Sequence, residues 1–308
     1  MGKNWNLVNS IEQAKDVVVF SGGACNIRDT SGNRLRNAER DMINGWLTRN
    51  DVLFFDPQIH PETHGTTYNY EVHQPLEVAA RKNAKINLFE ISPRTFGGAT
   101  ALEIAVDEFR YHDPSIIFFS DGNHEKDIIP SHSSDGYPLF APYGISENDA
   151  ARMTHYNEFV KGANRMRKYL MFFAEELSAL TITFGEQTFE GDVVITPTRM
   201  HAADFFRSVV RAASGHRTIV NFIGGEEARD ENGYPVFTAP EDPRPAELKT
   251  YLDQYMDEAN ELRRAIAELV RINVFSRVVF TQRDAINALS DLMRVQGIKQ
   301  EFEPVEIQ

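Results

Sequence analysis

The segment SPRTFGGATALEIAVDEF, residues 92–109, places a carboxylate beside a stretch of backbone with few side chains. Gly97 and Gly98 remove side chains where a ligand could approach the main chain closely. Thr100 can cap the helix expected to follow, and Glu103 would then project from the first turn of that helix. The positive end of the helix dipole would hold the carboxylate of Glu103 ionised, as a nucleophile or a general base requires. The alternative is that Glu103 only stabilises the helix N-terminus, as many first-turn glutamates do.

Further candidate binding residues follow the first two apolar runs of the chain, DVVVFSGG and DVLFFDPQ. Ser21, Gly22 and Gly23 end the first run, and the two glycines suit the close approach of a ligand. Asp56 ends the second run, where it would either grip a ligand or form a turn before Pro57. The GxGxxG fingerprint is absent after the first run, which argues against a dinucleotide site there.

Four arginines stand out in an otherwise acidic protein: Arg28, Arg34, Arg36 and Arg40. They would either bind the 5′-phosphate of a nucleotide or form a solvated helix face. Cys25 follows the first run, but no base can be assigned to activate its thiol. A small buried residue is the simpler interpretation of this cysteine.

His60 and His64 have the spacing of a helical zinc pair. Pro61 and Gly65 argue against a helix at this position, and the HExxH arrangement is absent. The single cysteine also excludes a cysteine-rich zinc site and an internal disulfide. The sequence therefore predicts no metal and no cofactor.

The candidate residues must be positioned by an alternation of apolar runs and helical patterns in the first half of the chain. The apolar runs lack polar alternation, which is typical of strands buried on both faces of a sheet. Helices between such strands predict an α/β fold, a Rossmann-like or flavodoxin-like parallel sheet with helices on both faces. Ligands of these sheets bind at the carboxyl ends of the strands, where the candidate residues lie. The expected strands are 16–23, 51–58, 85–91 and 115–120, and the expected helices are 33–50, 71–84 and one beginning near Thr100.

A boundary is expected within residues 121–144, which are rich in Gly, Pro, Ser and His and show no periodicity. A loop of this length is often a functional lid. Because 308 residues are too many for one ordinary core, two domains are expected, residues 1–145 and 146–308. The second is expected to be a largely helical α+β region with a hairpin over LTITFGEQTFEGDVVITPT.

The net charge of −13 argues against a broad surface for nucleic acid polymers. No apolar run approaches the ~20 residues that span a bilayer, and the N-terminus lacks the apolar stretch of a secretory signal. The sequence therefore predicts no membrane partner and a cytoplasmic location.

The segment ATALEIA and the strands around it resemble the nucleoside 2-deoxyribosyltransferase superfamily, in which a Gly-Thr-Ala-x-Glu segment supplies a nucleophilic glutamate. Ala99 stands in place of that glycine, and Glu103 matches the glutamate. VFSGGACN, DVLFFDPQ and PLEVAARKNAKINLFEI resemble the family's opening strand, its second strand, and the helix and strand before the nucleophile. The resemblance covers residues 16–122. Two positions depart from it, because Gly97 stands where the family commonly has an aspartate and Lys85 replaces an acidic residue.

The resemblance implies cleavage or transfer of the N-glycosidic bond of a (deoxy)nucleoside or nucleotide, with Glu103 forming a covalent glycosyl-enzyme. It also implies a homo-oligomer, because a neighbouring subunit often completes the family's active site. Two alternatives stay open: a nucleotide-sensing or binding module without turnover, and an enzyme that cleaves a nicotinamide nucleotide at its ribosidic bond. The substrate-binding residues expected around Glu103 are Ser21, Gly22, Gly23, Asp56, Gly98, Ala99 and Thr100.

Overall fold

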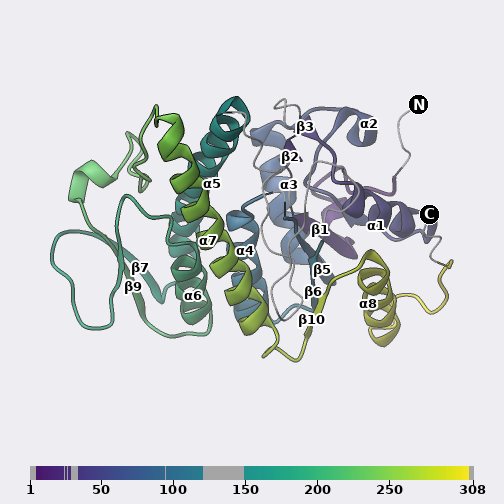
Figure 1. Cartoon of the computed structure of the whole chain (residues 1–308). Helices are drawn as coiled ribbons and strands as arrows, with labels where there is room; N and C mark the ends of the chain where they lie inside the picture. Colours follow the sequence, from purple (N-terminus) through teal and green to yellow (C-terminus); the bar gives the residue numbers. More distant parts are fainter. Residues whose placement is uncertain are drawn as a thin grey trace.

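The computed structural model describes residues 5–23, 25, 27–28, 34–93, 95–120 and 149–304. The loop or lid expected over residues 121–144 lies outside the described residues. In Figure 1 the described elements form successive layers, with a small sheet at the left, a five-stranded sheet in the right half, and helices between them.

The five-stranded sheet is parallel throughout, in the order β10-β6-β5-β1-β4. In chain order this is 2-1-3-4-5, the flavodoxin-like arrangement, and it confirms the predicted α/β fold class. Its three central strands, β5, β6 and most of β1, are buried on both faces, as their apolar sequences require. The strands are β1 (Val19–Gly23), β4 (Phe54–Phe55), β5 (Ile86–Ile91), β6 (Ser115–Phe119) and β10 (Ser276–Val279), and β2 (Ile27–Arg28) pairs with β3 (Arg34–Leu35) in a separate antiparallel ribbon.

Helices cover both faces of this sheet. Alternate strand residues point to opposite faces, so Val19 and Leu88 join one hydrophobic cluster while Phe20 and Phe89 join the other. The first cluster is closed by α1 (Ala38–Arg49) and α8 (Gln282–Val295), and the second by α3 (Tyr70–Asn83) and α4 (Gly98–Val106). Short helical segments are η1 (Gln13–Lys15), α2 (Pro61–His64) and a π-helical extension of α4, η2 (Asp107–Tyr111).

The second half of the chain adds three longer helices, α5 (Asp149–Glu176), α6 (Ala202–Ala213) and α7 (Pro245–Val270), and a second small sheet. This sheet is parallel in the order β7-β9-β8, from β7 (Leu180–Phe184), β9 (Thr218–Phe222) and β8 (Val193–Ile195), with η3 (Gly225–Ala228) after β9. The predicted hairpin over residues 180–198 was therefore wrong. The apolar strand β9 lies between β7 and β8 and pairs with both of them.

The chain leaves the five-stranded sheet after β6 and returns to it at β10, which pairs in parallel with β6. The region 149–270 is thus inserted between two neighbouring strands, whereas the expected division assigned everything beyond residue 145 to a second domain. Its helices α5 and α6 pack directly on α4 (Figure 1). No helix in the described part of the chain combines the length and apolar character needed to cross a bilayer.

Candidate active site

A cavity of about 570 Å³ opens at the carboxyl ends of β1 and β5. These two strands are neighbours, and the chain leaves them toward opposite sides of the sheet, which makes this the switch point where flavodoxin-like sheets bind ligands. Gly23 and Cys25 after β1, the cavity-facing residues of α3, residues 95–100 and one side of α5 line the cavity. The inserted region therefore supplies one wall of the cavity through α5. Without α5, the cavity at the edge of the sheet would be open on that side.

Glu103 lines this cavity, half-buried, from the second turn of α4. Gly97, in the left-handed region at φ 72°, is the N-cap, so the helix begins at Gly98. The expected capping by Thr100 is therefore wrong: Thr100 is buried within the first turn and lines the cavity. No hydrogen bond or ion pair from another described residue engages the carboxylate of Glu103.

The charge of Glu103 is set by its surroundings rather than by the helix dipole. Burial raises the pKa of Glu103 to about 7, the nearby Arg81 opposes that rise, and the carboxylate of Glu77 adds to it. The prediction that the helix N-terminus holds this carboxylate ionised was wrong, because a second-turn side chain lies beyond the strongest part of the dipole and is partly desolvated.

Glu77 of α3 is a second carboxylate in the same cavity. Burial raises the pKa of Glu77 to about 7, against the attraction of Arg81 and Arg40. Arg81 follows Glu77 by one helical turn, lines the cavity, and pairs with the buried Asp107 at 2.8 Å between Nη1 and Oδ1. The cavity thus contains two carboxylates whose pKa values burial raises to about 7, and the guanidinium of Arg81, which pairs with Asp107, lowers both of them.

Glu77 was not predicted as a site residue because EVHQPLEVAARKNA has the pattern of an ordinary amphipathic helix. A signal was present, since Glu77 and Arg81 share one face of the helix that leads into β5. The part played by α5 had no comparable signal, because its residues meet the cavity only through tertiary packing.

Two tyrosines, Tyr68 and Tyr169, line the cavity together with the carboxylates. Burial, followed by the charges of Glu103 and Glu77, raises the pKa of Tyr169 on α5 well above its usual value. Burial and Glu77 likewise raise the pKa of Tyr68 to about 12. Both phenols therefore stay protonated at neutral pH and can donate hydrogen bonds within the cavity.

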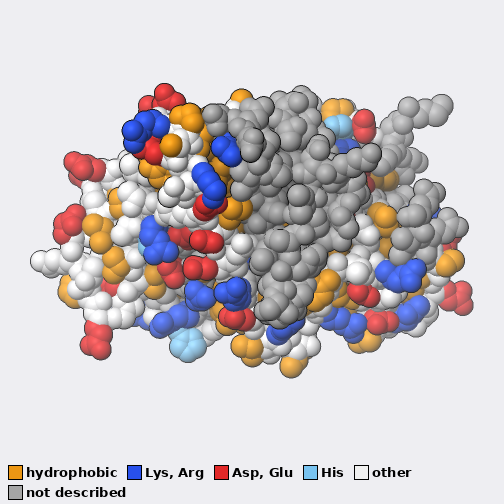
Figure 2. All heavy atoms as spheres, viewed as in Figure 1, with side chains coloured by type: hydrophobic (Ala, Val, Ile, Leu, Met, Phe, Trp, Pro, Cys, Tyr) orange, Lys and Arg blue, Asp and Glu red, His pale blue; other side chains and the backbone are white. Residues whose placement is uncertain are grey.

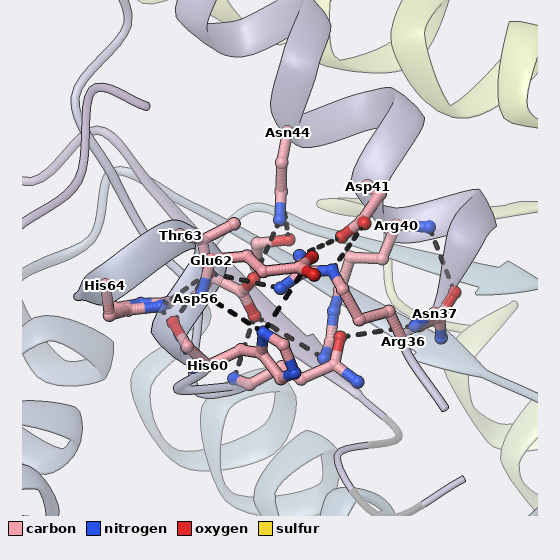
Figure 3. A network of polar contacts seen from close by, with 12 residues as sticks. Arg36, Asn37, Arg40, Asp41, Asn44, Asp56, His60, Glu62, Thr63 and His64 are labelled. Atoms are coloured by element: carbon pink, nitrogen blue, oxygen red, sulfur yellow. Dashed lines mark hydrogen bonds and ion pairs between the residues drawn. The ribbon is translucent and has the colours of Figure 1, made fainter. Parts of the chain in front are cut away.

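Asp56 is fully buried in a polar network that lies outside the cavity lining (Figure 3). Ser21 Oγ donates to Asn44 Oδ1 at 2.8 Å, Asn44 Nδ2 donates to Asp56 Oδ2 at 3.1 Å, and Arg40 pairs with Asp56 at 3.4 Å. Asp56 also accepts the backbone N–H of Gln58 at 2.9 Å, the turn contact that was its alternative interpretation. The cavity therefore brings Gly23, Gly98, Ala99, Thr100 and Glu103 together and leaves Ser21, Gly22 and Asp56 behind its wall.

The predicted arginine group divides in the structure. Arg40 is fully buried beside Asp56, so it is not part of a solvated face. Arg36 pairs with Asp41 at 2.7 Å between Nε and Oδ2, and it also donates to Thr63. The side chains of Arg28 and Arg34 lie outside the described residues.

Three of the predicted glycines, Gly22, Gly23 and Gly98, meet protein rather than open space, and a Cβ at Gly23 would lie 2.7 Å from the backbone oxygen of Glu90. A Cβ at Gly22 would lie 2.7 Å from the Phe20 ring, and one at Gly98 would lie 2.8 Å from Met166 Sδ of α5. At Gly97 a Cβ would meet nothing within 4 Å, so this is the glycine whose missing side chain leaves space in the cavity.

His60 is the N-cap of the short helix α2 and His64 is its last residue, so the expectation that Pro61 and Gly65 prevent a helix here was wrong. Pro61 occupies its first position, where the missing N–H costs nothing, and Gly65 ends it in the left-handed region. The Nδ1 atom of His60 accepts from the Glu62 N–H at 3.2 Å, and His64 Nδ1 contacts Thr63 Oγ1 at 2.9 Å (Figure 3). Burial raises the pKa of the half-buried Cys25 to about 11, which keeps its thiol protonated.

Within the described ranges, no three or more His, Cys, Asp or Glu side chains gather as metal ligands would. Comparison of the chain with protein-family models, curated proteins and solved structures gave no significant match. The resemblance to the nucleoside 2-deoxyribosyltransferase superfamily thus stays a prediction from the sequence motifs.

Proposed function

We propose that this protein cleaves or transfers the N-glycosidic bond of a nucleoside or nucleotide, with Glu103 as nucleophile and Glu77 as acid and base. The observation that carries the proposal is the meeting of these two carboxylates in one cavity at the switch point of the sheet. Their shared environment favours a single proton between them near neutral pH, which is the state that this chemistry needs.

The first step uses both carboxylates. A carboxylate oxygen of Glu103 attacks the anomeric carbon as the bond from that carbon to the base nitrogen breaks, and the released electron pair takes a proton from Glu77. In the second step water or another base attacks the anomeric carbon, the bond to Glu103 breaks, and Glu77 receives the proton of the incoming group. Two inversions give overall retention, as in retaining glycosidases.

The neighbouring residues support these steps. Arg81 favours the ionised form of Glu103, which the attack requires. The phenols of Tyr68 and Tyr169 can donate hydrogen bonds to sugar hydroxyls, and the rings lining the cavity can stack on a base.

Chromatography of the protein incubated with deoxynucleosides, nucleotides and free bases tests the proposal through released or exchanged base. We expect turnover by the native protein, and a loss of at least about a thousandfold in Glu103→Gln, because the nucleophile is removed. Glu261→Gln is the matched control, since Glu261 is exposed on α7 away from the cavity and its loss should change nothing. Equal rates for native protein and Glu103→Gln would contradict the proposal, and release of nicotinamide would direct it to nicotinamide nucleotides.

A binding module without turnover is the second candidate. The raised pKa of Glu103 favours it, because part of the protein then holds a protonated side chain that cannot attack. This candidate predicts that nucleotides raise the melting temperature without being consumed.

A further inference from the structure

We propose that the cavity takes a nucleoside carrying a 5′-phosphate, and that Arg165 and Lys168 of α5 bind this phosphate. The inference rests on the proposed function of the cavity and names its substrate class. It depends on residues of the inserted region, outside the segment that resembles the deoxyribosyltransferase superfamily.

One face of α5 forms the cavity wall. Phe159, Gly162, Arg165, Tyr169 and Phe172 recur at intervals of three and four residues and all line the cavity, as do Lys161 and Lys168 beside them. Basic side chains thus stand on successive turns of this wall, in a protein whose net charge is −13.

The charge of this wall is locally unbalanced around Arg165. From residue 159 to 174, α5 contains no aspartate or glutamate, whereas Glu158 and Glu175, which flank this stretch, also line the cavity. At one end of this stretch, Lys161 is already paired with Glu158 at 3.1 Å. Arg165 forms no ion pair with any other described residue, and Lys168 lies over the rings of Tyr70 and Tyr234 at 5.9 and 5.3 Å. Arg81 pairs with Asp107, so among the described cations that line the cavity Arg165 and Lys168 are the two without an ion-pair partner and are the candidates for binding an anion.

The position of the two cations fits a phosphate joined to the reacting sugar. Tyr169 lines the cavity with Glu103 and Glu77, and Met166 of the same helix packs against Gly98 at the start of the helix that carries Glu103. Lys168 is adjacent to Tyr169 in the chain. Arg165 lies one helical turn before Tyr169, which is about 5–6 Å along the axis of α5. In a nucleoside 5′-phosphate, the anomeric carbon and the phosphate are separated by the sugar ring and one CH₂–O unit. A sugar held over Glu103 would thus direct its 5′ substituent along the α5 wall.

Among the arginines near the first strand, the two whose side chains the structure describes, Arg36 and Arg40, do not offer an equal site. Arg36 and Arg40 are engaged by Asp41 and Asp56, and neither of them lines the cavity. The phosphate site is therefore assigned to α5.

The test compares a deoxynucleoside with its 5′-phosphate and its 3′-phosphate in native protein, the double variant Arg165→Ala/Lys168→Ala, and Arg264→Ala. Arg264 is exposed on α7 outside the cavity, which makes it the matched control. In the native protein, kcat/KM for the 5′-phosphate should exceed that for the nucleoside by about tenfold or more, and added salt should reduce this preference. The double variant should lose most of the preference, and Arg264→Ala should keep it.

Equal use of nucleoside and 5′-phosphate by the native protein would overturn the inference and leave the proposed function standing. A preference that survives in the double variant, or one that is the same for the 3′-phosphate, would also overturn it. If no compound is turned over, the proposed function fails, and calorimetric binding of the same compounds and of inorganic phosphate decides the inference separately. The inference is supported if the nucleoside 5′-phosphate binds more tightly than both the nucleoside and inorganic phosphate, and if the double variant loses this binding. Equal affinity for the nucleoside 5′-phosphate and for inorganic phosphate would overturn the inference.

Discussion

At the scale of single residues, Glu77 and Glu103 are the cavity groups that gain and lose protons near neutral pH. Glu77 and Glu103 interact with each other and with Arg81, and burial raises the pKa of each to about 7. Two carboxylates that interact in this way lose their protons in two titration steps, and the pKa of each step is a property of the pair and not of one residue. In the proposed reaction, the singly protonated pair, with Glu103 ionised and Glu77 protonated, is the state that attacks and protonates in one step.

The pH dependence of turnover should follow this state. We expect kcat/KM to have a bell shape with its maximum near neutral pH. The rate falls in acid because Glu103 gains a proton, and it falls in alkali because Glu77 loses one. Glu77→Gln should remove the alkaline limb, because an amide does not titrate there, and should lower the maximum. A rate that is unchanged from pH 5 to 9 would contradict the two assigned roles.

The same pair should lower the stability of the folded protein at alkaline pH. The folded-state pKa of Glu103 is about 7 against an ordinary value of 4.5, so its contribution is fully present below about pH 4.5 and is lost as pH rises through 7. Glu103→Gln should therefore raise the free energy of unfolding at pH 8 by about 1–2 kcal/mol, discounted for partial exposure, and by little at pH 4. Denaturant unfolding at both pH values measures this, with Glu261→Gln as control. A destabilised Glu103→Gln at pH 8 would mean that the charge of Glu103 is compensated.

At the scale of elements, close contacts fix where α4, the helix that carries Glu103, begins. The end of β1 packs against β5 through Gly22, where Phe20 and Phe89 fill the space of a side chain. The start of α4 packs against Met166 of α5 through Gly98. These two contacts place the sheet edge, α4 and α5 around one cavity.

Two glycine substitutions test this packing. Gly22→Ala should destabilise the fold by about 1–3 kcal/mol, because its methyl group would lie within 3 Å of two buried rings. Gly45→Ala in α1 should instead stabilise the protein by about 0.5–1 kcal/mol, since its nearest neighbour is the flexible Arg49 at 3.7 Å. Thermal unfolding of both variants gives the comparison. A neutral Gly22→Ala would show that β1 and β5 are less tightly packed than described.

Sequence patterns predicted the elements of the first sheet better than the residues of the site. The apolar runs at β1, β5 and β6 are long enough to be recognised, and they fixed the fold class. β10 was missed because SRVV is short and its partner β6 lies more than 150 residues earlier. Asp56 was misplaced because its partners Arg40 and Asn44 come from a helix whose packing the sequence does not specify.

At the scale of the whole molecule, the inserted region and the sheet depend on each other. The apolar face of α4 packs on α5 and α6, and β10 covers the edge of β6. On the face shown in Figure 2, basic and acidic side chains are intermixed over the described surface. The predicted homo-oligomer stays a prediction, as does the location of the protein in the cell.

A fragment of residues 1–145 should fail to form a stable domain. It would expose the edge of β6 and the apolar side of α4, and it would lack the α5 wall of the cavity. Circular dichroism during heating should show no cooperative transition for the fragment, whereas the full chain should unfold cooperatively. A cooperative fragment that still binds nucleosides would contradict the mutual dependence.

Mass spectrometry of the protein after reaction with a slow 2-fluoro nucleoside analogue tests whether Glu103 bonds covalently to the sugar in this cavity. We expect a mass increase of one fluorinated sugar, located on the peptide that contains Glu103, and none in Glu103→Gln. A sugar found on another residue, or base release without any adduct on Glu103, would show that Glu103 is not the nucleophile.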